Sequence, residues 1–372
     1  MFTDLIDVLF KPFEYKSLKL HNRLAMAPMT RYFSPGGHPT TDVAEYYLRR
    51  ARGGVGLIVT EALSPDREVA RNHDDIPWFH GERREAWEKI VDGVHESGAA
   101  IAPQIWHPGG ARDFTFPDAK LSDDLESPSG FYGPEVLGGR EMTEEDIADA
   151  SASFVRSAVD AKARGFDALE FHGGHGYLFD QFFWDATNKR GDRYGGASIG
   201  ERARFATETI RATREAVGED FVLLFRISQW KTKMYDARIV HSPAELEQWV
   251  QPLADAGVDI FDCSQRRYWE PEFDGSDLNL AGWTKKLTGC PTMTVGSIGL
   301  ATDVMTDIET NELSAPTPAT IQGVAERLER GEFDLVAVGR AMIADPDWAI
   351  KVRERRFRDL TAYSVELTKT LV

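Results

Sequence analysis

The sequence predicts an α/β fold, a single (β/α)8 TIM barrel that spans residues 1–372 as one domain. Two observations carry this prediction. Eight short apolar segments that end in turn residues recur along the chain, and amphipathic segments of helical period lie between them. Strands that alternate with helices pair in parallel, and eight such units close into a barrel.

The elements follow in order along the chain. The predicted strands are 23–28, 55–62, 99–107, 167–173, 221–228, 258–264, 291–298 and 333–340. The most regular helical patterns cover 81–97, 143–165, 201–218, 242–257 and 318–331. In the second of these, Thr143 and Asp146 have the spacing of a capping box, and Gly165 is suited to end the helix.

Two long segments interrupt this regular alternation. Residues 108–142 follow the third predicted strand, and residues 174–200 follow the fourth. Both begin where a strand ends, which is the face of the barrel where enzymes of this fold place their active sites. We therefore expect long active-face loops after strands three and four.

An open doubly wound sheet is the competing fold. It requires a G-x-G-x-x-G motif after the first strand and an acidic residue about twenty positions later. The first predicted strand runs instead into PMTRYFSPGG, and the later HGGHG does not fit the motif. The barrel is the better interpretation.

Composition limits the function. The net charge is -17, from 60 acidic against 43 basic residues, which argues against nucleic acid or an anionic membrane as a partner. No apolar run reaches the eighteen or so residues needed to span a bilayer, and MFTDLIDVLFKPF lacks a signal-peptide pattern. The two cysteines, Cys263 and Cys290, form no C-x-x-C pair. We expect a cytoplasmic protein without an iron–sulfur cluster.

Polar residues and glycines gather where the predicted strands end. They are Pro28, Met29, Thr30, Glu61, Ala62, Gln104, Trp106, His107, His172, His175, Arg226, Gly296, Ser297, Gly339 and Arg340. Glutamine can donate and accept, arginine suits an anion, and backbone amides after strands seven and eight can hold a phosphate. This set suits one ligand that carries carbonyls, ring nitrogens and a phosphate.

The stretch EFHGGHGYLFDQF, residues 170–182, contains the most concentrated polar chemistry. His172 and His175 could be zinc ligands, although Asp180 is only a weak third ligand. They could be satisfied structural histidines. They could also act as paired donors that hold a carbonyl oxygen of a flat ligand.

The motifs resemble the old yellow enzyme family, which consists of FMN-dependent ene-reductases. The resemblance rests on APMT, EYYLRRARGGVGLIVTEA, QIWHPGG, EFHGGHGYLFDQF, NKRGDRYGG, ERARF and VGRAMIADPDW, and it runs from about residue 9 to residue 350. It implies that FMN contacts Pro28, Met29, Thr30, Ala62, Gln104, His172, Arg226, Gly296, Ser297, Gly339 and Arg340. The last four would hold the phosphate, and Arg226 would hold negative charge at N1 of the reduced flavin.

The resemblance also implies the chemistry. NAD(P)H would reduce the flavin, whose N5 would pass hydride to the β-carbon of an α,β-unsaturated carbonyl compound. His172 and His175 would polarise the carbonyl, and Tyr177 would deliver a proton to the α-carbon. No metal is implied, and we expect a single-flavin enzyme that is a monomer or a homo-oligomer.

Aromatic residues near this face suggest a flat or apolar small-molecule substrate. The candidates are Trp106, Tyr268, Trp269 and Phe273, with Phe114, Phe116 and Tyr132 in the loop after strand three. Ser297 and three segments depart from the family pattern. The segments are SQW after Arg226, RRYW after strand six, and TDVMTDIETNELSAPTP after strand seven.

Two other functions stay open. A flavin-dependent dehydrogenase or demethylase of the same barrel family would move electrons from substrate to flavin. A flavin-free barrel lyase or metal hydrolase would use the histidines as ligands.

Overall fold

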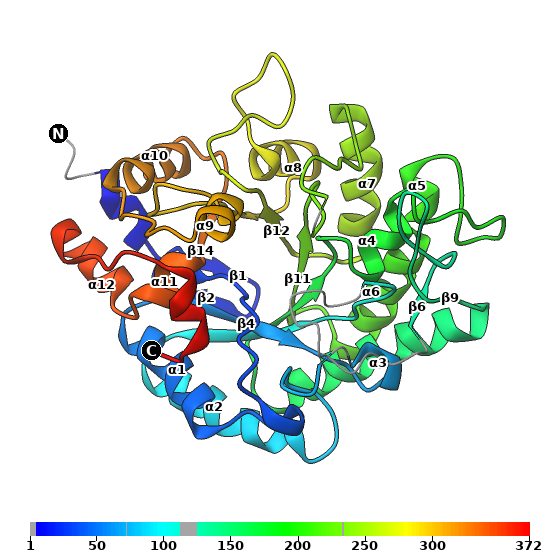
Figure 1. Ribbon diagram of the computed structural model, residues 1–372, viewed down its shortest axis with the longest axis horizontal. Coiled ribbons are helices and arrows are strands. Elements are labelled where there is room, and N and C mark those ends of the chain that lie inside the picture. The colour runs from blue at the N-terminus through cyan, green and yellow to red at the C-terminus, as the bar shows by residue number, and fades with distance from the viewer. Residues whose placement is uncertain (1–4, 72, 112–124, 233) are drawn as a thin grey trace.

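The computed structural model describes residues 5–71, 73–111, 125–232 and 234–372. Eight parallel strands form a closed barrel in the order β10-β11-β12-β13-β14-β3-β4-β5 (Figure 1). They are β3 (Leu24–Met26), β4 (Leu57–Leu63), β5 (Ala100–Ile105), β10 (Ala168–His172), β11 (Val222–Ile227), β12 (Ile260–Ser264), β13 (Thr292–Val295) and β14 (Leu335–Val338). Each lies at a predicted strand, so the predicted barrel is confirmed.

Helices surround the barrel and pack on the outward side chains of the strands (Figure 1). Those between the strands are α1 (Thr41–Arg52), α2 (Arg83–Glu96), α3 (Glu144–Ala163), α6 (Arg204–Val217), α7 (Pro243–Ala256), α8 (Leu280–Thr288) and α10 (Pro318–Glu329). The predicted helices are all present, and α1 and α8 were not predicted. The helical pattern of α8 was missed because the helix has only nine residues and contains Gly282.

The predicted capping box of α3 is confirmed. The Thr143 side chain accepts from the backbone N–H of Asp146, and the Asp146 carboxylate accepts from the backbone N–H of Thr143. Gly165 follows the helix at φ 81°, a conformation that glycine adopts without strain.

A two-stranded hairpin closes the end of the barrel where the strands begin. It consists of β1 (Phe13–Tyr15) and β2 (Leu18–Leu20), which pair antiparallel. Phe13, Leu18 and Leu20 join one apolar cluster with the inward side chains of the barrel strands. The polar residues lie at the opposite end of the barrel, where the strands finish.

The long loops fall where they were predicted, after β5 and β10. The first contains β6 (Glu126–Ser127), β7 (Phe131–Gly133), β8 (Val136–Leu137) and β9 (Arg140–Glu141), and the second contains α4 (Leu178–Phe183) and α5 (Ile199–Arg202). The candidate aromatics Phe114 and Phe116 lie outside the described residues.

The remaining helical elements are short. They are α9 (Val304–Thr310), α11 (Arg340–Ala344), α12 (Trp348–Arg353) and the 3₁₀ helices η1 (Leu5–Phe10), η2 (Pro35–Gly37), η3 (Glu68–Ala70), η4 (Phe357–Asp359) and η5 (Val365–Lys369). Across the described residues, no helix combines the length and apolarity that a bilayer crossing requires.

Candidate active site

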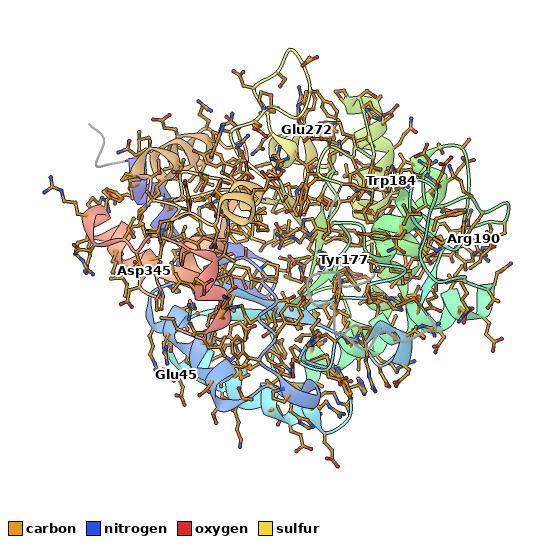
Figure 2. All side chains as sticks on the ribbon, in the orientation of Figure 1. Glu45, Tyr177, Trp184, Arg190, Glu272 and Asp345 are labelled. Carbon is orange, nitrogen blue, oxygen red and sulfur yellow. The ribbon has the colours of Figure 1, made fainter. Side chains whose placement is uncertain are left out.

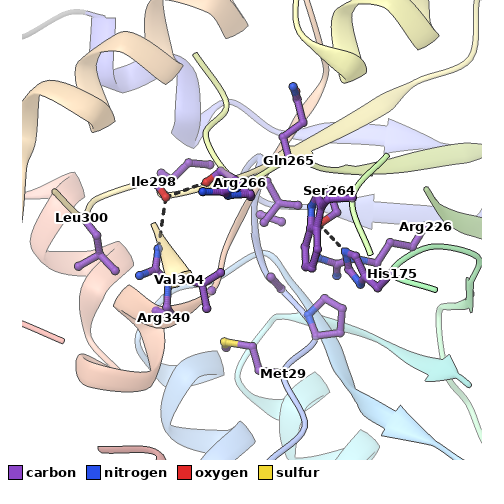
Figure 3. Close-up of a pocket in the computed structure, with 18 residues that line it drawn as sticks. Met29, His175, Arg226, Ser264, Gln265, Arg266, Ile298, Leu300, Val304 and Arg340 are labelled. Atoms are coloured by element: carbon purple, nitrogen blue, oxygen red, sulfur yellow. Dashed lines mark hydrogen bonds between the residues drawn. The ribbon is translucent and has the colours of Figure 1, made fainter. Parts of the chain in front are cut away.

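A cavity of about 220 Å³ opens where the barrel strands end (Figure 3). Several predicted flavin contacts line it: Pro28, Met29, Arg226, Gly296, Ser297, Gly339 and Arg340. His175 lines it too. These residues come from distant parts of the chain, and the closed barrel brings them together because all follow the same ends of parallel strands.

The other predicted flavin contacts lie next to this lining rather than in it. Gln104 on β5 stands opposite Ala62 on β4 in the strand register, and His172 stands opposite Arg226. Thr30 follows Met29 directly and is partly buried.

The interior of the barrel becomes polar at this level. Gln104 Nε2 donates to Glu170 Oε1 at 2.7 Å, and an Arg226 guanidinium nitrogen lies 3.1 Å from Asp262 Oδ2. Arg226 Nε is buried and has no hydrogen-bond partner in the structure. A buried guanidinium with an unused donor beside a cavity suits an anionic or electron-rich ligand group.

His172 and His175 are hydrogen-bonded to each other. His172 Nε2 lies 2.9 Å from His175 Nδ1, and His175 Nε2 lies 2.9 Å from Ser264 Oγ. This leaves His172 Nδ1 as the ring nitrogen of the pair that is buried without a partner. The pair is thus a chain that ends on Ser264, with one nitrogen available for a ligand oxygen.

Both imidazoles are kept neutral. Burial lowers the pKa of His172 well below its ordinary value, and the positive charge of Arg226 adds to the effect. Burial is also the main cause that lowers the pKa of His175, and electrostatic interactions with His172, Arg226 and Lys231 lower it further. A neutral imidazole donates one N–H and does not protonate an oxygen outright.

The loop after β11 fixes the backbone around His175. His175 has φ 62°, and its N–H donates to Ser228 Oγ at 2.8 Å, while its carbonyl accepts from Thr232 N–H at 3.1 Å. Gly173 is required for close packing, since a Cβ there would lie 2.0 Å from the Phe225 ring. Gly173 therefore lets the turn of HGGHG pack directly on β11.

Tyr177 lies near the centre of the strand-end face (Figure 2). Its ring meets His172 at 4.8 Å and Trp106 at 5.1 Å between centroids, both edge to face. Asp180 Oδ2 accepts from Gly176 N–H at 2.6 Å and Asp180 Oδ1 lies 2.9 Å from Lys231 Nζ, so a buried ion pair anchors the turn that carries Tyr177.

The predicted phosphate end consists of tightly packed backbone and one arginine. At Gly296, φ is 152° and a Cβ would lie 2.6 Å from the carbonyl oxygen of Gln265. Arg340 donates to Ser297 Oγ at 3.3 Å and to Thr302 O at 2.9 Å, and it pairs with Asp307 of α9. The unusual segment after strand seven thus supports Arg340, a role that sequence reasoning missed.

The predicted substrate aromatics of the RRYW loop do not reach the cavity in Figure 3. Tyr268 donates to Thr320 O at 2.7 Å, and the Phe273 ring packs on Trp283 at 5.7 Å. Neither they nor Trp269 line it. Among the described candidates, Trp106 lies close to the predicted catalytic residues, because it packs on Tyr177.

Trp230 was missed as a site residue. It lines the cavity, and its ring lies 4.1 Å from that of His175 at 31°. It also lines a neighbouring cavity of about 250 Å³ with Tyr235 and Arg266. The signal was present in the sequence, since SQW, residues 228–230, lies just after Arg226 and departs from the family pattern.

The residues present fit FMN. The cavity joins apolar side chains, an arginine with an unpaired buried donor and a cradle of tight backbone at Gly296 and Ser297. No group of three or more His, Cys, Asp and Glu side chains in the described ranges is arranged to hold a metal ion.

Comparison with known proteins agrees with this geometry. The model of the NADH:flavin oxidoreductase / NADH oxidase family matches residues 8–359. An NADH oxidase of Thermoanaerobacter brockii is 34% identical over 95% of this chain, which spans only 52% of that relative. The 12-oxophytodienoate reductase 7 of Oryza sativa subsp. japonica is 30% identical, over 93% of this chain and 87% of the relative.

A structure of morphinone reductase in complex with tetrahydroNAD superposes with a TM-score of 0.75 and 25% identity, over 93% of this chain and 90% of that one. From the family match, the relatives and the shared barrel, the chain belongs to the NADH:flavin oxidoreductase / NADH oxidase family, the old yellow enzyme family that its motifs resemble.

Proposed function

We propose that the protein is an FMN-dependent NAD(P)H oxidoreductase that reduces the activated C=C bond of α,β-unsaturated carbonyl compounds. The observation that carries the proposal is the set of His172, His175 and Tyr177 beside a cavity whose lining fits FMN. We also propose that residues 1–372 act as one FMN-binding domain.

FMN, when bound, accepts hydride from NAD(P)H and supplies it to the alkene. Ala62 and Gln104 would contact the pyrimidine end, with Arg226 at N1. Pro28, Met29 and Thr30 would lie along the ring, and Gly296, Ser297, Gly339 and Arg340 would hold the phosphate. The barrel would fix these groups before the reaction, because they stand on its strands or directly after them.

The histidine pair holds the substrate carbonyl. His172 donates an N–H to the oxygen, and its bond to His175 and Ser264 fixes the ring that donates. As negative charge develops on the oxygen, a positioned neutral donor stabilises it in a site that excludes water. Tyr177 then delivers the proton to the α-carbon.

Trp230 and Trp106 replace the RRYW aromatics as the proposed substrate walls. Trp230 packs on His175 with tilted rings, and Trp106 packs on Tyr177, so both flank the proposed reacting groups. Two flat apolar surfaces favour a flat or apolar small molecule.

The test uses purified protein reconstituted with FMN. We expect NAD(P)H to bleach the flavin anaerobically and an added enone to restore its colour. His172→Ala should weaken binding of a phenol, which mimics the enolate oxygen, and slow recolouring. Flavin that NAD(P)H reduces but no enone or nitroalkene reoxidises would count against the proposal. Faster flavin reduction by an amine or alcohol than by NAD(P)H would favour the dehydrogenase alternative.

A further inference from the structure

Two buried carboxyl groups, Glu170 and Asp262, lie inside the barrel and take no part in the reaction proposed above. Both are fully buried. Glu170 accepts from Gln104 at 2.7 Å, and Asp262 lies 3.1 Å from Arg226. Each acid therefore holds one of the two side chains proposed to contact the pyrimidine end or N1 of the flavin.

The two acids share one cation. Arg226 pairs with Asp262 at 3.1 Å, and its positive charge also lowers the pKa of Glu170, whereas the buried Lys231 pairs with Asp180 at 2.9 Å. Glu170 Oε2 and both oxygens of Asp262 receive no hydrogen bond from a described residue. Two ionised carboxylates against one guanidinium would leave a net negative charge in the barrel, which burial strongly disfavours.

A shared proton resolves this imbalance. Burial raises the pKa of Glu170 well above its ordinary value, and the neighbouring Asp262 raises it further. Burial raises the pKa of Asp262 as well, against the lowering effect of Arg226. Acids that raise each other's proton affinity titrate as a pair, and one proton on the two leaves one negative charge to match Arg226.

We propose that Glu170 and Asp262 form an acid pair that holds one proton, and that its remaining negative charge offsets Arg226 and lowers the reduction potential of the bound flavin. Both are positioning residues, since they act through Gln104 and Arg226. The proposal rests on the FMN binding proposed above.

Electrostatics gives the direction of the expected change in the reduction potential of the flavin. Arg226 stabilises negative charge on the reduced flavin, and a carboxylate 3.1 Å away weakens that effect. Removing the negative charge favours reduced over oxidised flavin and raises the potential. For a two-electron couple, each tenfold change in the ratio of the two affinities corresponds to about 30 mV.

The experiment measures the midpoint potential of the flavin by anaerobic titration against a reference dye. The double variant Glu170→Gln with Asp262→Asn should raise it by at least the amount that a tenfold affinity ratio gives. Each single variant should raise it less, because the remaining carboxyl group takes over the charge. Glu170→Gln with Asp262→Ser serves if the first double variant does not fold.

Asp259→Asn is the matched control. Asp259 is also a buried acid, but it lies before the start of β12 and pairs with Lys16 at 2.6 Å and with Arg214. It should leave the potential unchanged.

An unchanged potential in the double variant overturns the inference, as does a single variant that shifts it as much as the double. If wild-type protein binds FMN and reduces enones while the double variant keeps the wild-type potential, only this inference fails. Wild-type protein that binds no FMN overturns both proposals.

Discussion

The two halves of the barrel interior are built from the same strands but differ in chemistry. Near the strand starts the inward residues are apolar, as at Ala168, Val222, Leu224 and Ile260. Nearer the strand ends the same faces carry Glu170, Arg226 and Asp262. The side chains named here are buried in both halves, and buried charged groups are costly unless they are paired, so the second half is built for polar contacts rather than for stability.

The largest expected effect lies in the polar half. Tyr177→Phe should slow reoxidation of reduced flavin by an enone by about 10²–10⁴-fold, because the proton donor is lost. Reduction by NAD(P)H should change little. Stopped-flow absorbance follows the two half-reactions separately. Tyr194→Phe, which removes a hydroxyl bonded to Glu208 instead, should leave both rates as they are, and an equal loss in both variants would contradict the assignment.

The apolar half should respond in stability alone. Leu224→Ala should lower the free energy of unfolding by about 2–5 kcal/mol, since it opens a cavity in a fully buried layer. The spectrum and potential of the bound flavin should stay as in the wild type. Urea unfolding measures the change in stability, and the absorption spectrum shows whether the bound flavin is unchanged. A large change in potential would show that the halves are not separate in function.

The histidine pair should make stability depend on pH. Its pKa values are lowered below 6.5 in the folded protein, so the unfolded chain binds more protons below that pH. The free energy of unfolding is thus unaffected by the pair above pH 6.5. It decreases as the pH falls below 6.5, by about 1.4 kcal/mol per pH unit for each proton.

Glu61 acts in the opposite sense, since burial raises its pKa to about 7. The stability that protonated Glu61 contributes is lost as the pH rises. The effect of His172 is therefore isolated by comparing the wild type with His172→Gln, since both contain Glu61. Urea unfolding from pH 5 to 8 at fixed FMN should give a smaller loss below pH 6.5 in the variant. Equal slopes would contradict the neutral state of His172.

The smallest expected effect comes from a comparison of substitutions at two tryptophans. Trp230→Leu removes the ring packed on His175 and should lower enone turnover about two- to tenfold, the loss expected for about 0.5–1.5 kcal/mol. Trp269→Leu should not change turnover, because Trp269 packs on Tyr268 instead. Steady-state rates with one flat enone compare them. The reverse order would restore the RRYW loop as the substrate wall.

Sequence reasoning located the fold well because its signals are local. Strand ends, capping residues such as Thr143 and the period of the helices depend on neighbours in the chain, and they matched the structure. It missed α8, whose pattern is short, and it could not give the direction of the RRYW aromatics, which depends on loop packing.

The sequence by itself determined that eight βα units form a barrel, and it placed His172, His175, Arg226 and Arg340 at strand ends. Hydrophobic period locates the strands and helices, and their alternation makes the strands parallel. The tertiary structure alone decided which atoms meet. It joined His172 to His175 and Ser264, and it placed Trp230 on His175. It also set two acids against one arginine. Such contacts depend on the register between strands and on loop packing, and residues far apart in the chain fix both.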